Sequence, residues 1–173
     1  MYYPNAYIDF LIHFHGDRDY FECHEILEDY WKQTNPSNRY SIWVGFIQLA
    51  VAQYHYRRGN EKGAKKLIIK SIAIFKRNRL ELKHLDIDVN RLLNSLNDLQ
   101  TAYNNGQAYQ NINLPISNQK LVNICKDKCY LSGIQWCNDD LVSDLIVHRH
   151  LQRVHIENQN ERSLEKRKEP SFS

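Results

Sequence analysis

The sequence predicts an all-α fold, a compact multi-helix bundle of about five core helices followed by two C-terminal helices. Long segments repeat their apolar residues at the spacing of a helix. The 173 residues include only 6 Gly and 4 Pro, so few positions interrupt a helix. The βαβ alternation of nucleotide-binding folds is missing, as are the motifs GxGxxG and GxxxxGK[ST]. A composition of 42% hydrophobic and 25% charged residues is typical of a soluble globular protein.

Five of the expected helices lie in the first 104 residues. The first begins at Pro4, which suits a first helical turn. The second begins at a cap formed by Asp17 or Asp19. The third is apolar nearly all round, which is typical of a central helix covered on several sides. The fourth is amphipathic, and the fifth begins at Asp88. These helices are expected over residues 4–15, 19–32, 39–58, 61–78 and 88–104.

The rest of the chain is expected to add two helices to the same domain. Residues 107–116 lack a helical period and are predicted to form an ordered crossing loop. Ser117 is the expected cap of a sixth helix, and Asp139 or Asp140 that of a seventh. Residues 1–156 are therefore predicted to form a single all-α domain. Apolar residues nearly vanish over 157–173, which predicts a charged tail.

The sequence carries no feature of a secreted or membrane protein. Residues 1–9 do not resemble a signal peptide, and the apolar run 42–52 is too short to span a bilayer. We expect a cytoplasmic protein without a membrane partner. In a reducing compartment the four cysteines are expected to be free thiols, with Cys23 a buried hydrophobic residue. Cys125, Cys129 and Cys137 could bind zinc with His148 or His150, but their spacing matches no familiar zinc module.

Two polar residues of the second helix lie among aromatic residues. With about 100° between successive residues, His24 falls in the apolar sector that contains Tyr20 and Trp31. Glu28 lies one turn later, between Trp31 and Phe21. Glu22, Glu25 and Asp29 are expected on the opposite, solvated side.

The third helix has a comparable line of residues at Gly45, Gln48, Ala52 and His55. The two small residues allow another helix to approach, which would bury the Gln and the His. If the second and third helices pair in antiparallel fashion, four polar side chains could converge: His24, Glu28, Gln48 and His55. Tyr20, Phe21 and Trp31 would line the same pocket.

Three interpretations of this polar group remain open: a hydrogen-bonded core network, a metal or small-ligand site, and a catalytic site. Burial of these side chains without partners would cost several kcal/mol, so they must satisfy one another or a ligand. His24, His55 and Glu28 could hold a divalent metal in a hydrolase or transferase, with Glu25 or a bound water as the acid–base group. The zinc-protease motif HExxH is absent, because Glu28 stands where its second His would be.

Several motifs together resemble the domain-of-unknown-function family 309, a family of small bacterial and archaeal helical proteins. The resemblance rests on residues 21–28 with Trp31, 45–52 with Tyr54 and His55, 59–60 and 63–64. It is dense from about His15 to Leu67, with a family-like core of about 15–80. Through Arg153 the chain resembles the longer variant of Bacillus-type bacteria. The resemblance implies a compact α-helical domain and no established activity.

A basic stretch supports a different hypothesis. Residues 57–83 contain ten Lys and Arg but two acids, a local charge of +8 against +3 for the whole chain. One face of the fourth helix carries Lys62, Lys65, Lys66, Lys70, Lys76 and Arg77. This face could follow a nucleic-acid backbone, although no nucleic-acid-binding motif accompanies it. It could also meet the acidic segment 17–29 of a second copy, whose charge is −5, in a homodimer. The leading prediction remains a helical binding or interaction protein with a polar site.

Overall fold

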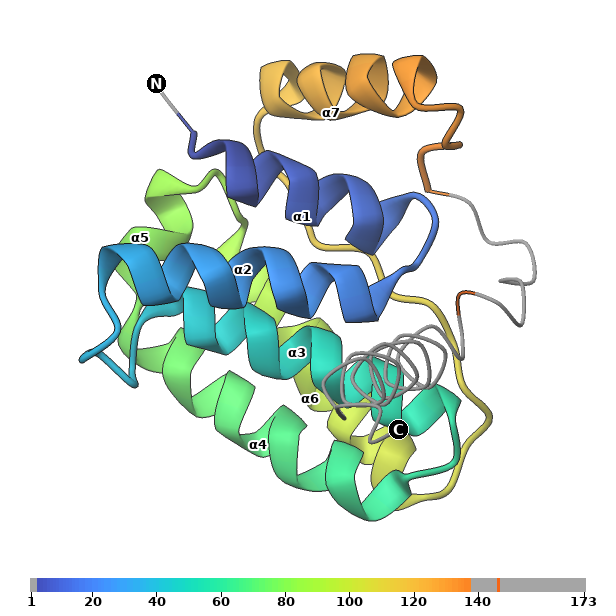
Figure 1. Cartoon of the computed structure of the whole chain (residues 1–173). Coiled ribbons are helices and arrows are strands. Elements are labelled where there is room, and N and C mark those ends of the chain that lie inside the picture. Colours follow the sequence, from blue (N-terminus) through green and yellow to red (C-terminus); the bar gives the residue numbers. More distant parts are fainter. Residues whose placement is uncertain (1–2, 138–145, 147–173) are drawn as a thin grey trace, which may run out of the picture.

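The computed structural model describes residues 3–137 and residue 146, and this part of the chain is helical, as predicted. Its helices are α1 (Asn5–His15), α2 (Tyr20–Thr34), α3 (Ile42–Arg57), α4 (Glu61–Arg77), α5 (Arg79–His84), α6 (Val89–Asn104) and α7 (Gln119–Leu131). Helices α1 to α4 follow one another side by side, with α6 behind α3 and α4 and α7 along α1 (Figure 1). Within the described residues no helix is both long and apolar enough to cross a bilayer.

Side-chain caps mark the starts of α2, α3, α4, α6 and α7, whereas α1 and α5 begin without one. Asp19 accepts a hydrogen bond from the backbone N–H of Glu22 at the start of α2, and Asp88 accepts from Asn90 and Arg91 at the start of α6. The predicted cap Ser117 is wrong. Its hydroxyl donates to the Asp86 carbonyl, and Asn118 caps α7 instead. The short helix α5 was not expected from the sequence.

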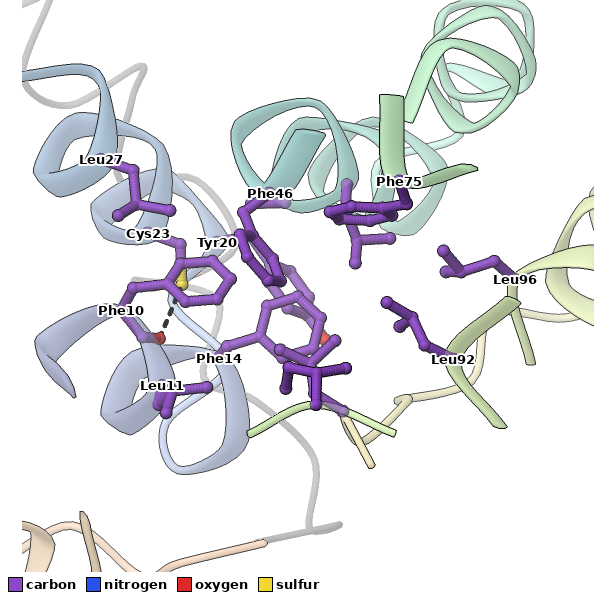
Figure 2. Close-up of a cluster of buried hydrophobic side chains, with 14 of the residues drawn as sticks. Phe10, Leu11, Phe14, Tyr20, Cys23, Leu27, Phe46, Phe75, Leu92 and Leu96 are labelled. Atoms are coloured by element: carbon purple, nitrogen blue, oxygen red, sulfur yellow. Dashed lines mark hydrogen bonds between the residues drawn. The ribbon is translucent and has the colours of Figure 1, made fainter. Parts of the chain in front are cut away.

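Helix α3 is central, as its uniformly apolar sequence predicts. Its Phe46 ring lies 5.3 Å from that of Phe10 in α1 and 4.9 Å from that of Phe75 in α4, centroid to centroid. Phe10 and Phe14 of α1 and Tyr20 and Cys23 of α2 surround the same core (Figure 2). Because α2 and α4 flank α3, most of its surface is buried.

Helices α3 and α4 approach closely at Gly45. A Cβ atom built on Gly45 would lie 2.8 Å from a ring carbon of Phe75 and 3.0 Å from Ile74 Cγ2. The buried Ser71 hydroxyl donates to the Gly45 carbonyl at 2.8 Å. The glycine was expected to admit a neighbouring helix, and that neighbour is α4.

The loop between α6 and α7 is an ordered crossing segment, as predicted. Ile116 forms an isolated antiparallel bridge with Ile87, and the Asp88 N–H donates to the Pro115 carbonyl at 2.8 Å. Leu114 is buried in the core. The loop thereby carries the chain to α7, which packs on α1.

All four cysteines are free thiols, as expected. Cys23 is fully buried, its thiol contacts the Phe10 carbonyl at 3.6 Å, and burial raises its pKa well above the usual value. Cys125, Cys129 and Cys137 do not form a metal-ligand group within the described residues. The predicted seventh helix from Asp139 or Asp140, with His148 and His150, lies outside the described residues. The domain end at 156 and the tail 157–173 lie there too, so they stay predictions.

Gly45→Ala is expected to lower the free energy of unfolding by about 1–2 kcal/mol. Overpacking a core costs about 1–3 kcal/mol, and the higher helix propensity of Ala recovers about 0.5–1 kcal/mol. Urea unfolding measures the difference. Asn94→Ala, on the exposed side of α6, is the control and should stay within about 0.5 kcal/mol of the parent. Unchanged stability of Gly45→Ala would contradict the close approach of α3 and α4.

Candidate functional site

A pocket of about 180 Å³ lies between α2 and α3. The structure brings two of the predicted ligand residues, His24 and His55, to this pocket together with the predicted lining residues Tyr20 and Phe21. Val51 and Tyr54 of α3 complete the lining. The expected meeting of these edges of the two helices is therefore found for both histidines. We call this hollow the histidine pocket.

His24 lies between two carboxylates of its own helix. Its Nδ1 is 2.9 Å from Oε1 of Glu25, and its Nε2 is 3.6 Å from Oε2 of Glu28. Lys32 also pairs with that Glu28 oxygen, at 3.2 Å. One donor atom from each of His24, Glu25 and Glu28 lies within 4.8 Å of the others. These atoms are close enough to hold one cation.

Two expectations about this edge of α2 are wrong. The His24 side chain is 27% exposed and that of Glu28 is 33% exposed, so neither is buried. The core side of α2 is formed by Tyr20, Cys23 and Leu27, which turns the His24 edge toward the rim of the bundle. Glu25, expected to point away into water, lies against His24 because its flexible side chain folds back toward the ring.

His55 is held at the other side of the pocket. Asn60 Nδ2 lies 3.1 Å from His55 Nδ1, which leaves Nε2 as the ring nitrogen for a ligand. Burial lowers the pKa of His55, and the charge of Arg58 lowers it further. The Arg58 guanidinium also forms a cation–π contact with the Tyr54 ring, with its central carbon 5.2 Å from the ring centroid. A neutral imidazole can accept a hydrogen bond or bind a metal.

Gln48 does not join the histidines, which corrects the predicted convergence of four residues. It lines a second hollow of about 240 Å³ between α3 and α4, which we call the cationic pocket. The line from Gly45 to Gln48 faces α4, because α4 approaches α3 at Gly45. The Oε1 atom of Gln48 is buried there without a hydrogen-bond partner. Trp31 also lies apart from the histidine pocket lining, and its Nε1 donates to the Asn38 carbonyl at 3.1 Å.

The basic face of α4 is a surface feature, as its pattern indicates. Five of its cationic side chains are exposed, namely Lys62, Lys66, Lys70, Lys76 and Arg77. Lys65 is half-buried and pairs with Glu61 at 3.1 Å. Contact of this face with nucleic acid or a second copy stays a prediction.

Comparison with known proteins assigns the family. The model of the family Domain of unknown function (DUF309) matches residues 7–67. The chain is also 42% identical over 169 residues to the Uncharacterized protein YpuF of Bacillus subtilis (strain 168), covering 96% of this chain and 97% of that protein.

This chain belongs to the DUF309 family. The DUF309 match begins in α1 and ends within α4, so it contains His24, Gln48 and His55. The similarity to YpuF extends far beyond it, as expected for the longer variant of the family. No solved structure showed a significant match to the chain.

The DUF309 chain also contains a buried cation that sequence reasoning missed. Arg18 is 1% exposed and lies in the left-handed region with φ of 57°. Its Nη1 donates to the carbonyls of Phe14 and Ile112, and its Nη2 donates to Asn113 Oδ1, each at 2.9 Å. Arg57 Nη1 donates to the Arg18 carbonyl at 2.8 Å. The sequence offered one indication that Arg18 is unusual, because it is the only Lys or Arg in the acidic segment 17–29.

Beside this cluster, His15 is buried in an uncharged form. Its ring stacks on Trp136 at 4.6 Å with an interplanar angle of 10°. Burial lowers the pKa of His15 to about 3, with a further contribution from the charge of Arg18. Protonation of His15 therefore opposes folding.

Stability should fall on acidification because His15 takes up a proton more readily in the unfolded chain. The unfolded pKa is about 6.5 and the folded pKa about 3, so stability is complete above about pH 6.5 and declines toward pH 3. Between pH 7 and pH 5 this residue alone should cost about 2 kcal/mol. Urea unfolding should show that His15→Phe, which keeps a ring against Trp136, removes this loss. The exposed-site control His84→Gln should retain it, and equal losses in both variants would rule out this role of His15.

Proposed function

We propose that this DUF309 protein is a binding protein whose histidine pocket takes a small, mostly apolar ring that hydrogen-bonds to His24 and His55. The observation that carries the proposal is that two histidines from different helices line one hollow whose other walls are Tyr20, Phe21, Val51 and Tyr54. Ligand sites commonly combine apolar walls with a few polar groups that orient the ligand. Of the four polar residues that the sequence suggests for a binding site, the proposal uses His24 and His55 as the groups that contact the ligand.

The size of the pocket sets the class of ligand. Its volume of about 180 Å³ is comparable to an engineered apolar cavity of about 150 Å³ that binds benzene. The rings of Phe21 and Tyr54 lie 6.2 Å apart, centroid to centroid, and Phe21 is equally far from His24. Such rings favour a flat aromatic group, because offset and edge-to-face ring contacts stabilise it.

The polar groups of the pocket are held in place by their neighbours. Glu25 and Glu28 flank the His24 ring, while Asn60 contacts His55 Nδ1. Restrained polar groups lose less conformational entropy when a ligand binds. This supports recognition of a ring that carries a hydrogen-bonding edge.

The pocket can be tested with indole as the ring probe, by following backbone amide chemical shifts during a titration. Indole should shift signals of the α2 and α3 residues that line the pocket. Val51→Phe should weaken binding at least tenfold, because the added ring fills the pocket. Ile47→Phe changes a half-buried residue one turn away on α3, outside the lining, and should leave the affinity within about twofold. Equal effects of the two variants, or no shifts with the parent protein, would refute the proposal.

A second candidate function is a divalent-metal-dependent hydrolase or transferase. The observation that favours it is the group of donor atoms from His24, Glu25 and Glu28 within 4.8 Å. Imidazole and carboxylate ligands suit Zn²⁺, Mn²⁺ and Fe²⁺. The proposed ligand set differs from the sequence-based one, because Glu25 takes the place of His55.

Zn²⁺ and Mn²⁺ should raise the melting temperature if this second candidate is right. A metal present at about 100 times its Kd adds about 2.7 kcal/mol of stability, or several degrees for a chain of this size. His24→Ala and Glu25→Gln should abolish the shift, whereas His55→Ala should keep it. Loss of the shift in His55→Ala would favour the ligand set expected from the sequence, and absence of any shift would exclude metal binding here.

A further inference from the structure

The cationic pocket lies between α3 and α4, whereas the histidine pocket lies between α2 and α3. Arg39 and Tyr40 precede α3, Gln48 comes from α3 itself, and Lys70 and Arg77 come from α4. Lys70, Ala73 and Arg77 follow one another at i, i+3 and i+7, so they share one side of α4. The small side chain of Ala73 leaves space between the two cations.

The charges around this hollow are uncompensated. Three cationic side chains line it, and no acid does. In the described part of the chain, none of Arg39, Lys70 and Arg77 pairs with a carboxylate, whereas Lys65 of the same helix does. The Arg77 guanidinium carbon lies 4.7 Å from the Tyr40 ring centroid, a cation–π contact that orients the side chain. Cations gathered around a hollow concentrate their potential within it, which attracts an anion.

The chemistry of the lining favours phosphate over carboxylate. A carboxylate offers two oxygens, which one guanidinium can satisfy in a bidentate contact. A phosphate monoester offers three terminal oxygens, which suits cations that approach from three positions on two segments. The pocket volume of about 240 Å³ leaves room for more than the phosphate group.

Gln48 favours a ligand that carries a hydrogen-bond donor. Its Oε1 atom is buried at the pocket without a partner. A buried acceptor without a hydrogen bond is unfavourable, and a ligand hydroxyl would satisfy it. The ligand therefore needs a hydroxyl group near its phosphate.

We propose that the cationic pocket binds the phosphate group of a small hydroxyl-bearing phosphate ester, with Arg39, Lys70 and Arg77 contacting the phosphate and Gln48 accepting from a hydroxyl. This site is separate from the histidine pocket and does not depend on its proposed ligand. It also differs from a diffuse contact of nucleic acid with α4, because Lys62, Lys66 and Lys76 lie outside the lining.

Calorimetric titration of the full chain with ribose 5-phosphate at low salt tests the site. Arg39→Gln and Lys70→Gln should each weaken binding at least tenfold. Lys66→Gln is the matched control, since it removes the same charge from an exposed position one turn away on α4, and its affinity should stay within about twofold. Equal losses in Lys66→Gln and Lys70→Gln, or no binding by the parent protein, would overturn the proposal.

Two further probes test whether the pocket prefers a small phosphate ester to free inorganic phosphate and to a nucleic acid. Inorganic phosphate should bind more weakly than ribose 5-phosphate, and Gln48→Leu should remove most of that difference. A twelve-nucleotide single-stranded DNA should bind no better than ribose 5-phosphate. Tight DNA binding that Lys62→Gln, Lys66→Gln and Lys70→Gln weaken equally would show a polyanion surface and overturn the pocket assignment. Circular dichroism of each variant confirms that a loss of binding is not a loss of fold.

Discussion

Phe46 packs against Tyr7 and Phe10 of α1 and against Phe75 of α4, and this aromatic contact holds α3 at the centre of the bundle. Burial of such large rings contributes much of the hydrophobic stabilisation of a core of this size. With α3 held there, α2 and α4 must lie along its two sides. Only a narrow strip of α3 stays half-exposed, including Gln48, Val51 and His55. Both pockets adjoin this strip, one on each side.

The wall of the histidine pocket is stabilised from behind by polar contacts. Tyr20, which lines the pocket, accepts a hydrogen bond from the Tyr109 hydroxyl at 2.9 Å, and the Arg57 guanidinium stacks on its ring at 4.8 Å. Arg57 in turn donates to the carbonyl of Arg18. Because Arg18 donates to the crossing loop at Ile112 and Asn113, the loop, the α1–α2 turn and the end of α3 form one connected structure. Pockets built on restrained side chains bind with a smaller loss of entropy.

The candidate site was predictable in part. Helical spacing placed His24 and His55 on helix edges that could meet, and they line one pocket. Helical spacing could not predict which pocket Gln48 lines. A helical projection gives the direction of a residue around its own helix, but it does not say which other helix lies in that direction. The position of Glu25 was wrong for another reason. A helical projection gives only the direction in which a side chain leaves the helix, whereas the long Glu25 side chain bends back to the ring of the adjacent His24.

The sequence by itself determined the helices of the described residues other than α5, the central place of α3 and the crossing loop between α6 and α7. These features follow from local information, namely apolar periodicity and capping residues such as Asp19 and Asp88. Only the tertiary structure decided that the Gly45 edge meets α4 and that Arg39 joins Lys70 around one hollow. It also decided that Arg18 is buried. These outcomes depend on contacts between segments far apart in the chain, which no local pattern encodes.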